Sequence, residues 1–517
     1  MKLTRKSGLF ELVNRLTTSE KRYIKQFINR AGESNSNYAK LFNLIIKTEI
    51  CDDEELKKKF KKIAIVKQWS RTKNYLYNYI LRVLQVYNQQ NVEFEILNNL
   101  QQVDILYKKG LDGDAYQLLK KTKKLAFEGI YPTLLPFIAE WEMRLGRLIW
   151  NYQEEKEPLN YQKNNEWALD VANNLLLLEK YRTDVLINMV AKGRHLRVKE
   201  INQEILAKAV FKSIDEAKSP FSKWAFCVTK NIIYAQVWQF FDVYSSAKDG
   251  IELHRQFPLL KKQAPRTYIA SINNFIAAAI EIGKWDEALM IMEEIDLYVE
   301  KNNDEINNVL LMSIKYLAFL KLKIESRDYE GWEEYGEEIE TFIKKHKKEN
   351  NTYVRPDYIL QYYTVICIVN GEFVKALELI EDIEQIQKIA IYRNAVLLMK
   401  LICLFELNEV LQLPYVIRSI YRNLRKKKDL FDFERIILNL FKASANVASK
   451  NELKNVFRRY LVQLKKLAQT APKAELELLE HFDFLAWMES KVEDRPLLEI
   501  LKEHSMPSIK KTNGASQ

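Results

Sequence analysis

The chain has 517 residues, of which 47% are hydrophobic and 29% are charged, and its formal net charge is +11. Glycine and proline number only 13 and 11, whereas average composition would give roughly 36 and 26. Because turns consume both residue types, this composition excludes a strand-rich fold and predicts an all-α chain of long helices joined by short polar connections.

The sequence shows no targeting or membrane-spanning signal. Residues 1–16 carry charges but no apolar segment of the kind that a secretory signal needs. No run approaches the ~18 uninterrupted apolar residues of a membrane helix, so we expect a cytoplasmic protein. The four cysteines, which form no CxxC pair, should be reduced packing residues; they are Cys51, Cys227, Cys367 and Cys403.

Residues 1–100 predict a compact, basic helical head. The entire excess of positive charge falls within residues 1–130, which suggests that this region meets an acidic partner. Thr17 and Glu20 have the spacing of a capping box that opens a helix ending near Gly32. Further helices are expected over 38–48, from 52–55 onward, and over 67–90. The last should bury a stripe of Trp69, Leu76, Ile80, Val83, Leu84 and Tyr87.

A basic and aromatic cluster in this head is the strongest candidate for binding nucleic acid or an acidic protein surface. Lysine and arginine would neutralise phosphates, and exposed aromatic rings would stack on bases. Alternatively, the lysines only aid solubility and the rings pack inward, although Tyr75, Tyr77 and Tyr79 cannot all share the buried stripe. The cluster comprises Lys57, Lys58, Lys59, Lys61, Lys62, Lys67, Arg71, Lys73, Tyr75 and Arg82.

From about residue 100 the pattern becomes repetitive. Residues 271–296 and 360–383 each place a glycine, an aromatic residue two positions later, and an alanine three positions after that. These residues are Gly283, Trp285 and Ala288, then Gly371, Phe373 and Ala376. The pattern resembles the tetratricopeptide repeat (TPR). The glycine would end one helix at positive φ, the aromatic ring would fill the gap between helices, and the alanine would let them cross closely.

Weaker copies surround these two units. Positions equivalent to the glycine are 245, 283, 327, 371 and 408, and Gly110 precedes Ala115 in the same way. Their spacing is longer than the 34-residue TPR period. The resemblance implies a divergent right-handed α-α superhelix, similar to bacterial TPR-like proteins with no assigned activity. We expect a repeat array over 101–440, capping helices over 441–505, and a disordered tail over 506–517.

The resemblance also implies a groove lined by the first helix of each repeat, where a protein partner would bind. Candidate groove residues are Asn273, Asn274, Gln361 and Tyr362. An ordinary solvated helix face is the alternative.

A second basic group has two interpretations. It comprises Arg422, Arg425, Lys426, Lys427 and Lys428, with Arg458, Arg459, Lys465 and Lys466 as an extension. The first interpretation is a set of cations at a helix C-terminus, where they meet the negative end of the helix dipole. The other is a site for phosphate or an acidic peptide.

No motif for catalysis, a cofactor or a metal is present: the sequence lacks GxGxxG, GxxxxGK[ST] and GxSxG, and its five histidines form no metal-binding pair. The leading hypothesis is a non-catalytic interaction scaffold that binds a protein partner. The alternative is a nucleic-acid- or ribosome-associated factor that uses the head. A hydrolase with paired carboxylates is a weaker hypothesis. A DNA-binding regulator is also a weaker hypothesis, because the turn between Ile28 and Tyr38 is too long for a standard helix-turn-helix.

Overall fold

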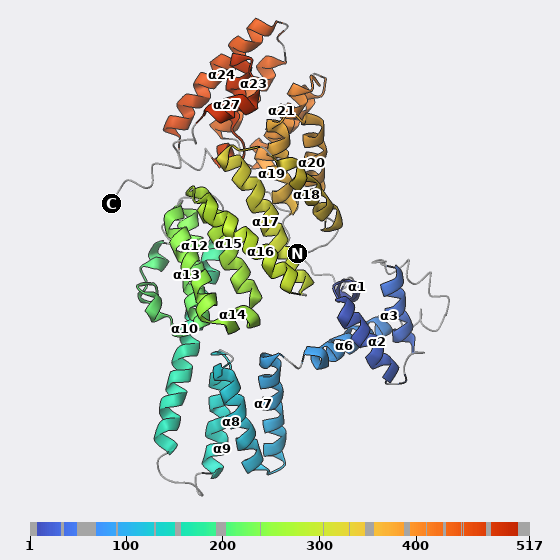
Figure 1. The fold of residues 1–517 in the computed structure, drawn as a ribbon, viewed down its shortest axis with the longest axis vertical. Helices are drawn as coiled ribbons and strands as arrows, with labels where there is room; N and C mark the ends of the chain where they lie inside the picture. Colours follow the sequence, from blue (N-terminus) through green and yellow to red (C-terminus); the bar gives the residue numbers. More distant parts are fainter. Residues whose placement is uncertain are drawn as a thin grey trace. The chain divides into compact units, whose positions relative to one another are not determined.

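The protein is all-α and solenoid-like, and the part described by this computed structural model contains helices and no strand (Figure 1). The described residues are 8–30, 32, 36–48, 69–88, 91–128, 131–149, 157–192, 203–237, 239–302, 304–329, 331–346, 356–386, 393–409, 411–427, 431–445, 447, 449–471 and 477–504. The predicted helix start at 52–55 and the tail at 506–517 lie outside them.

The chain divides into two compact units. Unit 1 comprises residues 1–177 and 218–222, and unit 2 comprises 178–217 and 223–517. The division falls within a single long helix, α10 (Glu157–Lys192). The boundaries expected at residues 100 and 440 stay predictions.

The N-terminal part of unit 1 forms the predicted helical head. Its helices are α1 (Gly8–Asn14), α2 (Thr18–Arg30), α3 (Asn37–Thr48) and α6 (Trp69–Tyr87). The capping box is confirmed: the Thr17 amide donates to the Glu20 carboxylate at 2.7 Å, and the Glu20 amide donates to Thr17 Oγ1 at 3.2 Å. Helix α6 packs against the other three and buries Trp69, Leu76, Ile80 and Val83 as predicted. Of the other two residues of the predicted stripe, Leu84 is half-buried and Tyr87 is exposed.

The rest of unit 1 begins with a helical hairpin. It consists of α7 (Val92–Lys108) and α8 (Asp112–Glu128), followed by α9 (Leu135–Ile149). Gly110 closes α7 at φ 73°, and the Leu111 amide donates back to the Leu106 carbonyl at 3.0 Å. Ala115 is fully buried in the hairpin. This unit therefore follows the glycine-to-alanine pattern expected from the sequence.

Unit 2 is a succession of helices that pack on their neighbours in the chain. After the end of α10 and two short 3₁₀ turns, Ala209–Phe211 and Ile214–Glu216, the helices are α12 (Pro220–Gln236), α13 (Phe240–Gln256), α14 (Pro258–Gln263), α15 (Pro265–Glu281), α16 (Trp285–Lys301), α17 (Glu305–Ser326), α18 (Trp332–His346), α19 (Pro356–Val369), α20 (Phe373–Ile386), α21 (Arg393–Glu406) and α22 (Leu413–Lys427). Helices α13, α15, α17 and α19 pack one on the next, while α16, α18 and α20 are the second helices beside them.

The predicted glycine positions end the first helices. Gly283 has φ 77° and Gly371 has φ 80°. In each case the next amide donates to the carbonyl five residues back, from Lys284 to Ala279 at 2.9 Å and from Glu372 to Cys367 at 2.8 Å. This bonding is that of a Schellman motif, which satisfies carbonyls that a helix end otherwise leaves unpaired.

Two weaker copies use other residues at the same left-handed position. Arg327 has φ 56° and Asn408 has φ 58°. The prediction for Ser245 is wrong, because that residue lies inside α13. The small residues there allow close packing instead. Ser246 Oγ donates to the Cys227 carbonyl at 3.0 Å, and a Cβ atom added at Gly250 would lie only 3.0 Å from Ser271 Oγ.

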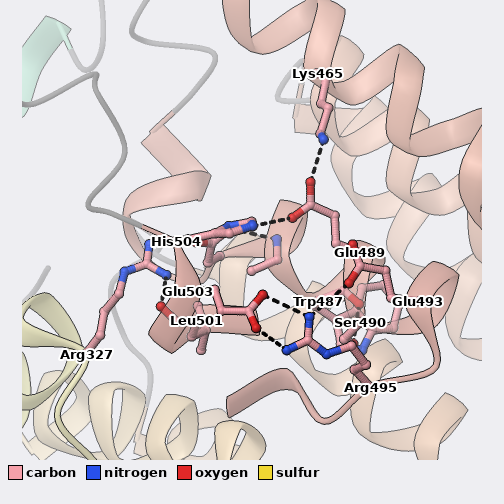
Figure 2. Close-up of polar contacts among 12 residues, drawn as sticks. Arg327, Lys465, Trp487, Glu489, Ser490, Glu493, Arg495, Leu501, Glu503 and His504 are labelled. Carbon is pink, nitrogen blue, oxygen red and sulfur yellow. Dashed lines mark hydrogen bonds and ion pairs between the residues drawn. The ribbon is translucent and has the colours of Figure 1, made fainter. Parts of the chain in front are cut away.

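The last helices of unit 2 are α23 (Asp432–Ser444), α24 (Lys450–Thr470), α26 (Phe484–Glu493) and α27 (Leu497–Glu503), with a 3₁₀ turn at Glu477–Glu480. Trp487 of α26 is 1% exposed and contacts the rings of Phe405, Phe441 and Phe457. Figure 2 shows the polar side of this region, where Arg327 reaches from the end of α17 to the carbonyl of Leu501 at 3.0 Å. The same guanidinium pairs with Asp483 at 3.1 Å, so Arg327 ties α17 to the C-terminal helices.

Candidate interaction surfaces

The described part of the basic head cluster lies on α6. Lys57, Lys58, Lys59, Lys61, Lys62 and Lys67 fall outside the described residues. Arg71, Tyr75 and Arg82 are exposed and share one face of α6, since they are spaced by four and seven residues. Tyr75 is 49% exposed, although its ring contacts that of Tyr38.

Lys73 of the same cluster lies elsewhere on the helix. It is half-buried, and its ammonium lies 5.8 Å from the centre of the Phe10 ring. Lys73 therefore contributes to packing between α1 and α6. The structure brings together two of the predicted cations and one aromatic ring on the exposed face of the head.

The four candidate groove residues differ in their access to solvent. Asn273 is exposed, and Asn274 and Tyr362 are half-buried, whereas Gln361 is buried at 3% exposure. A ligand on the surface described here can reach Asn273, Asn274 and Tyr362 but not the Gln361 side chain. The backbone explains the contrast: Gln361 and Tyr362 are consecutive in α19 and point about 100° apart around the helix.

Two charged residues that sequence reasoning missed lie beside these positions. Glu281 of α15 follows Asn274 by seven residues and therefore shares its helix face. Lys321 of α17 forms an ion pair with Glu281, and their side chains are 20% and 9% exposed. We call the surface formed by Asn274, Glu281, Lys321 and Tyr362 the first-helix face.

The Lys321–Glu281 pair is electrostatically coupled to the rest of this face. Burial lowers the pKa of Lys321, but the Glu281 carboxylate, Tyr362 and Glu325 together raise it by more, so that the pKa of this lysine is raised overall. Lys321 thus keeps its proton at neutral pH. A lysine that serves as a nucleophile or a base needs the opposite shift, so its chemistry here is that of a fixed cation.

Tyrosine–carboxylate bonds join the first helices to the second helices. The Tyr363 hydroxyl of α19 donates to Glu340 of α18 at 2.8 Å, and Lys375 of α20 pairs with the same carboxylate at 2.8 Å. In the preceding repeats, Tyr244 of α13 donates to Glu287 of α16. Burial raises the pKa of Tyr363, so the hydroxyl remains a donor. These bonds hold α19 against α18 and α13 against α16.

The repeat-packing residues occupy the positions that the sequence pattern predicts. Ala288 and Ala376 are fully buried, and Trp285 and Phe373 are half-buried against the two hydrophobic cores of this region. In the repeat between them, Trp332 takes the place of the alanine and is 4% exposed. Gly336, one turn later, makes room for it: an ideal Cβ there would lie 3.1 Å from the Trp332 ring.

The described cysteines and His254 are core residues. Cys227, Cys367 and Cys403 are reduced and buried, as predicted. Burial raises the pKa of Cys227 and of Cys403 to about 12, so these thiols stay protonated. His254 is 3% exposed, with Nδ1 2.7 Å from the Gly250 carbonyl, and burial lowers its pKa.

A hollow of about 470 Å³ lies at the ends of α16, α17 and α18. Its lining includes Glu300, Asn308, Met312, Lys345 and His346. The volume falls within the range of small-molecule sites, but such sites are mostly apolar and enclose their ligand. This hollow is shallow and mixed in polarity, so it is a weaker candidate site than the helix faces.

No protein-family model matches the chain, and no curated protein or solved structure is significantly similar to it. Function is therefore inferred from the surfaces alone.

Among the described helices, none combines the length and apolar character that crossing a membrane requires. The described part of the chain likewise contains no group of three or more His, Cys, Asp or Glu side chains that could hold a metal ion.

The second basic group is divided between two helices. Arg422 and Arg425 are exposed on α22, and the side chains of Lys426 and Lys427 and the whole of Lys428 lie outside the described part. Arg458, Arg459, Lys465 and Lys466 are exposed on α24. Lys465 is paired with Glu489 at 2.5 Å, so it belongs to the polar network of the C-terminal helices in Figure 2.

Proposed function

We propose that this protein is a non-catalytic, cytoplasmic interaction scaffold of the TPR-like type, which binds a protein partner through the first-helix face. The observation that carries the proposal is the placement of Asn274, Glu281, Lys321 and Tyr362 on first helices that pack one on the next. The Asn274 amide and the Tyr362 phenol are half-buried and within reach of a partner, whereas the Lys321–Glu281 pair on the same face is largely withdrawn from water. Such a surface suits an extended peptide or a helix, whose polar groups require partners.

The rigidity of this face supports the proposal. The Lys321–Glu281 pair joins α17 to α15, and the bond from Tyr363 to Glu340 holds α19 against the second helix α18. A face held in place before binding loses little conformational entropy when a partner arrives, and this favours affinity.

An affinity purification from the native cell tests the proposal. The wild type would be compared with the double variant Asn274→Ala/Tyr362→Ala, and every preparation would be treated with nuclease. The control is Met290→Ala/Val374→Ala, which removes two side chains that are 67% and 61% exposed on the second helices α16 and α20. We expect the control to keep the wild-type partners and the first-helix variant to lose them. Equal recovery from all three proteins would contradict the proposal.

The alternative function is a nucleic-acid- or ribosome-associated factor that acts through the head. The observation in its favour is the exposed face of α6 with Arg71, Tyr75 and Arg82. This alternative predicts that the full-length protein binds single-stranded RNA more tightly as salt is lowered, because phosphate contacts release counterions. It also predicts that Arg71→Glu/Arg82→Glu reduces this binding. Absence of RNA binding at low salt would contradict this alternative function.

A further inference from the structure

Helix α22 has a buried face and an exposed face of opposite character. Leu413, Ile417, Ile420 and Leu424 are each at most 8% exposed and face the core of unit 2. The exposed positions recur at the same helical period on the other side; they are Tyr415, Arg418, Arg422 and Arg425. We call these four residues the α22 arginine face.

The arginines of this face have no acidic partner in the part of the chain that the structure describes. Arg418 contacts the Tyr415 ring, with its guanidinium carbon 5.0 Å from the ring centre, and donates to the Pro414 carbonyl at 3.2 Å. The sequence of α22, LPYVIRSIYRNLRKK, contains no carboxylate. By contrast, Arg495 in the same unit pairs with Glu493 and Glu503 (Figure 2), and also with Glu499.

The helix dipole does not account for this arrangement. A cation interacts favourably with the negative end of a helix only within the last turn. Arg418 and Arg422 lie more than one turn before Lys427, where α22 ends. The C-terminal interpretation of the sequence therefore applies to the end of the cluster and leaves the middle of the helix unexplained.

Two large exposed hydrophobic residues lie at or just before the start of the same helix. Tyr415 is 70% exposed, and Leu411, just before the helix, is 86% exposed. Tyrosine and arginine are enriched in the parts of protein interfaces that contribute most to binding. A guanidinium also fits a carboxylate with two parallel hydrogen bonds.

We propose that the α22 arginine face binds an acidic protein segment, which places its carboxylates on Arg418, Arg422 and Arg425 and an apolar side chain on Tyr415 and Leu411. The three arginines span only about 10 Å of helix axis. That length suits a few carboxylates along a peptide. Tight binding of nucleic acid requires the neutralisation of many more phosphates. This surface is separate from the first-helix face, and the inference does not rest on the proposed function.

The test uses the full-length protein and a fluorescein-labelled helical peptide with glutamates spaced four and three residues apart and a leucine one turn away. Fluorescence anisotropy at low salt would compare it with the same peptide carrying glutamine, and with a single-stranded oligouridylate of equal charge. We expect saturable binding of the acidic peptide, and binding of the glutamine peptide that is about tenfold weaker or more. The proposal would be overturned if the acidic peptide showed no saturable binding. It would also be overturned if the oligouridylate bound more tightly than the acidic peptide and Arg418→Glu/Arg422→Glu abolished that binding.

A matched variant separates this face from general electrostatic attraction. Arg418→Glu/Arg422→Glu and Arg458→Glu/Arg459→Glu change the net charge equally and alter exposed side chains of one unit. We expect the first to weaken the acidic peptide about tenfold or more and the second to alter it less than about twofold. Equal losses would overturn the proposal. Circular dichroism and thermal unfolding would verify that both variants are folded, and Tyr415→Ala, which leaves the charge unchanged, should weaken binding several-fold.

Discussion

Lys321 of α17 and Glu281 of α15 form an ion pair between residues 40 positions apart in the chain, and both side chains are largely withdrawn from water. The pair lies where two first helices pack on each other. It combines a structural role, in joining neighbouring repeats, with a chemical one, in placing a fixed charge beside Asn274 and Tyr362. The stability of this pair is therefore linked to the surface that we propose to bind a partner.

Removing one partner of this pair should destabilise unit 2. Lys321→Met takes the ammonium away from the Glu281 carboxylate, which stays in a mostly buried site, at an expected cost of about 3 kcal/mol in the free energy of unfolding. Urea unfolding would measure it. The double variant Glu281→Leu/Lys321→Met should recover much of the loss, because two apolar side chains replace the pair without leaving a charge behind. A double variant less stable than either single variant would contradict this account.

The left-handed helix ends predict opposite effects of the same substitution at two positions. Asn408→Gly should stabilise the protein by about 0.5 kcal/mol, because glycine adopts φ 58° without strain. Arg327→Gly relieves similar strain but removes the bonds to Asp483 and Leu501, and should destabilise overall. Thermal unfolding of both variants would measure the two signs. Stabilisation by Arg327→Gly would show that the contacts of this arginine contribute little.

His254 predicts a pH dependence of stability. Burial lowers its pKa in the folded state, and the nearby Lys261 lowers it further, while the bond to Gly250 opposes them. The unfolded chain, with a histidine pKa of about 6.5, therefore binds more protons as pH falls through that value, and the free energy of unfolding decreases. Thermal unfolding between about pH 7.5 and 5.5 should show a falling midpoint for the wild type and a flatter dependence for His254→Gln. Equal slopes would mean that other groups cause the effect.

The capping box at the start of α2 predicts a local effect in the head. Thr17→Ala removes the acceptor of the Glu20 amide and should cost about 1 kcal/mol. Thr18→Ala is the matched control, because Thr18 is exposed in the first turn of α2 and the substitution removes the same atoms from the side chain. The comparison requires thermal unfolding followed by circular dichroism. A similar cost for the two substitutions would argue against the specific role of Thr17.

Local features of this fold could be predicted from the sequence, because their causes lie within a few residues. The buried part of the α6 stripe, from Trp69 to Val83, the capping box, and the helix ends at Gly283 and Gly371 each depend on near neighbours. Period and capping chemistry are visible in one segment of chain.

Features that depend on distant partners could not be predicted in this way. The role of Arg327 at a glycine position depends on α26 and α27, more than 150 residues later. The small residues around Ser245 suggested a turn, but they allow α13 to approach α12 and α15 closely. Glu281 could not be singled out from the sequence, since its partner Lys321 is recognisable only once α17 is in place.

Site-specific photocrosslinking in the native cell tests the central claim most directly. A photoreactive amino acid would replace Asn274 or Tyr362 on the first-helix face, or Met290 or Val374 on the second helices as exposed controls. The account predicts discrete crosslinked protein adducts at 274 and 362 that persist after nuclease treatment, with none of the same adducts at 290 and 374. Adducts distributed equally over all four positions, or absent from 274 and 362, would contradict a scaffold that binds its partner through this face.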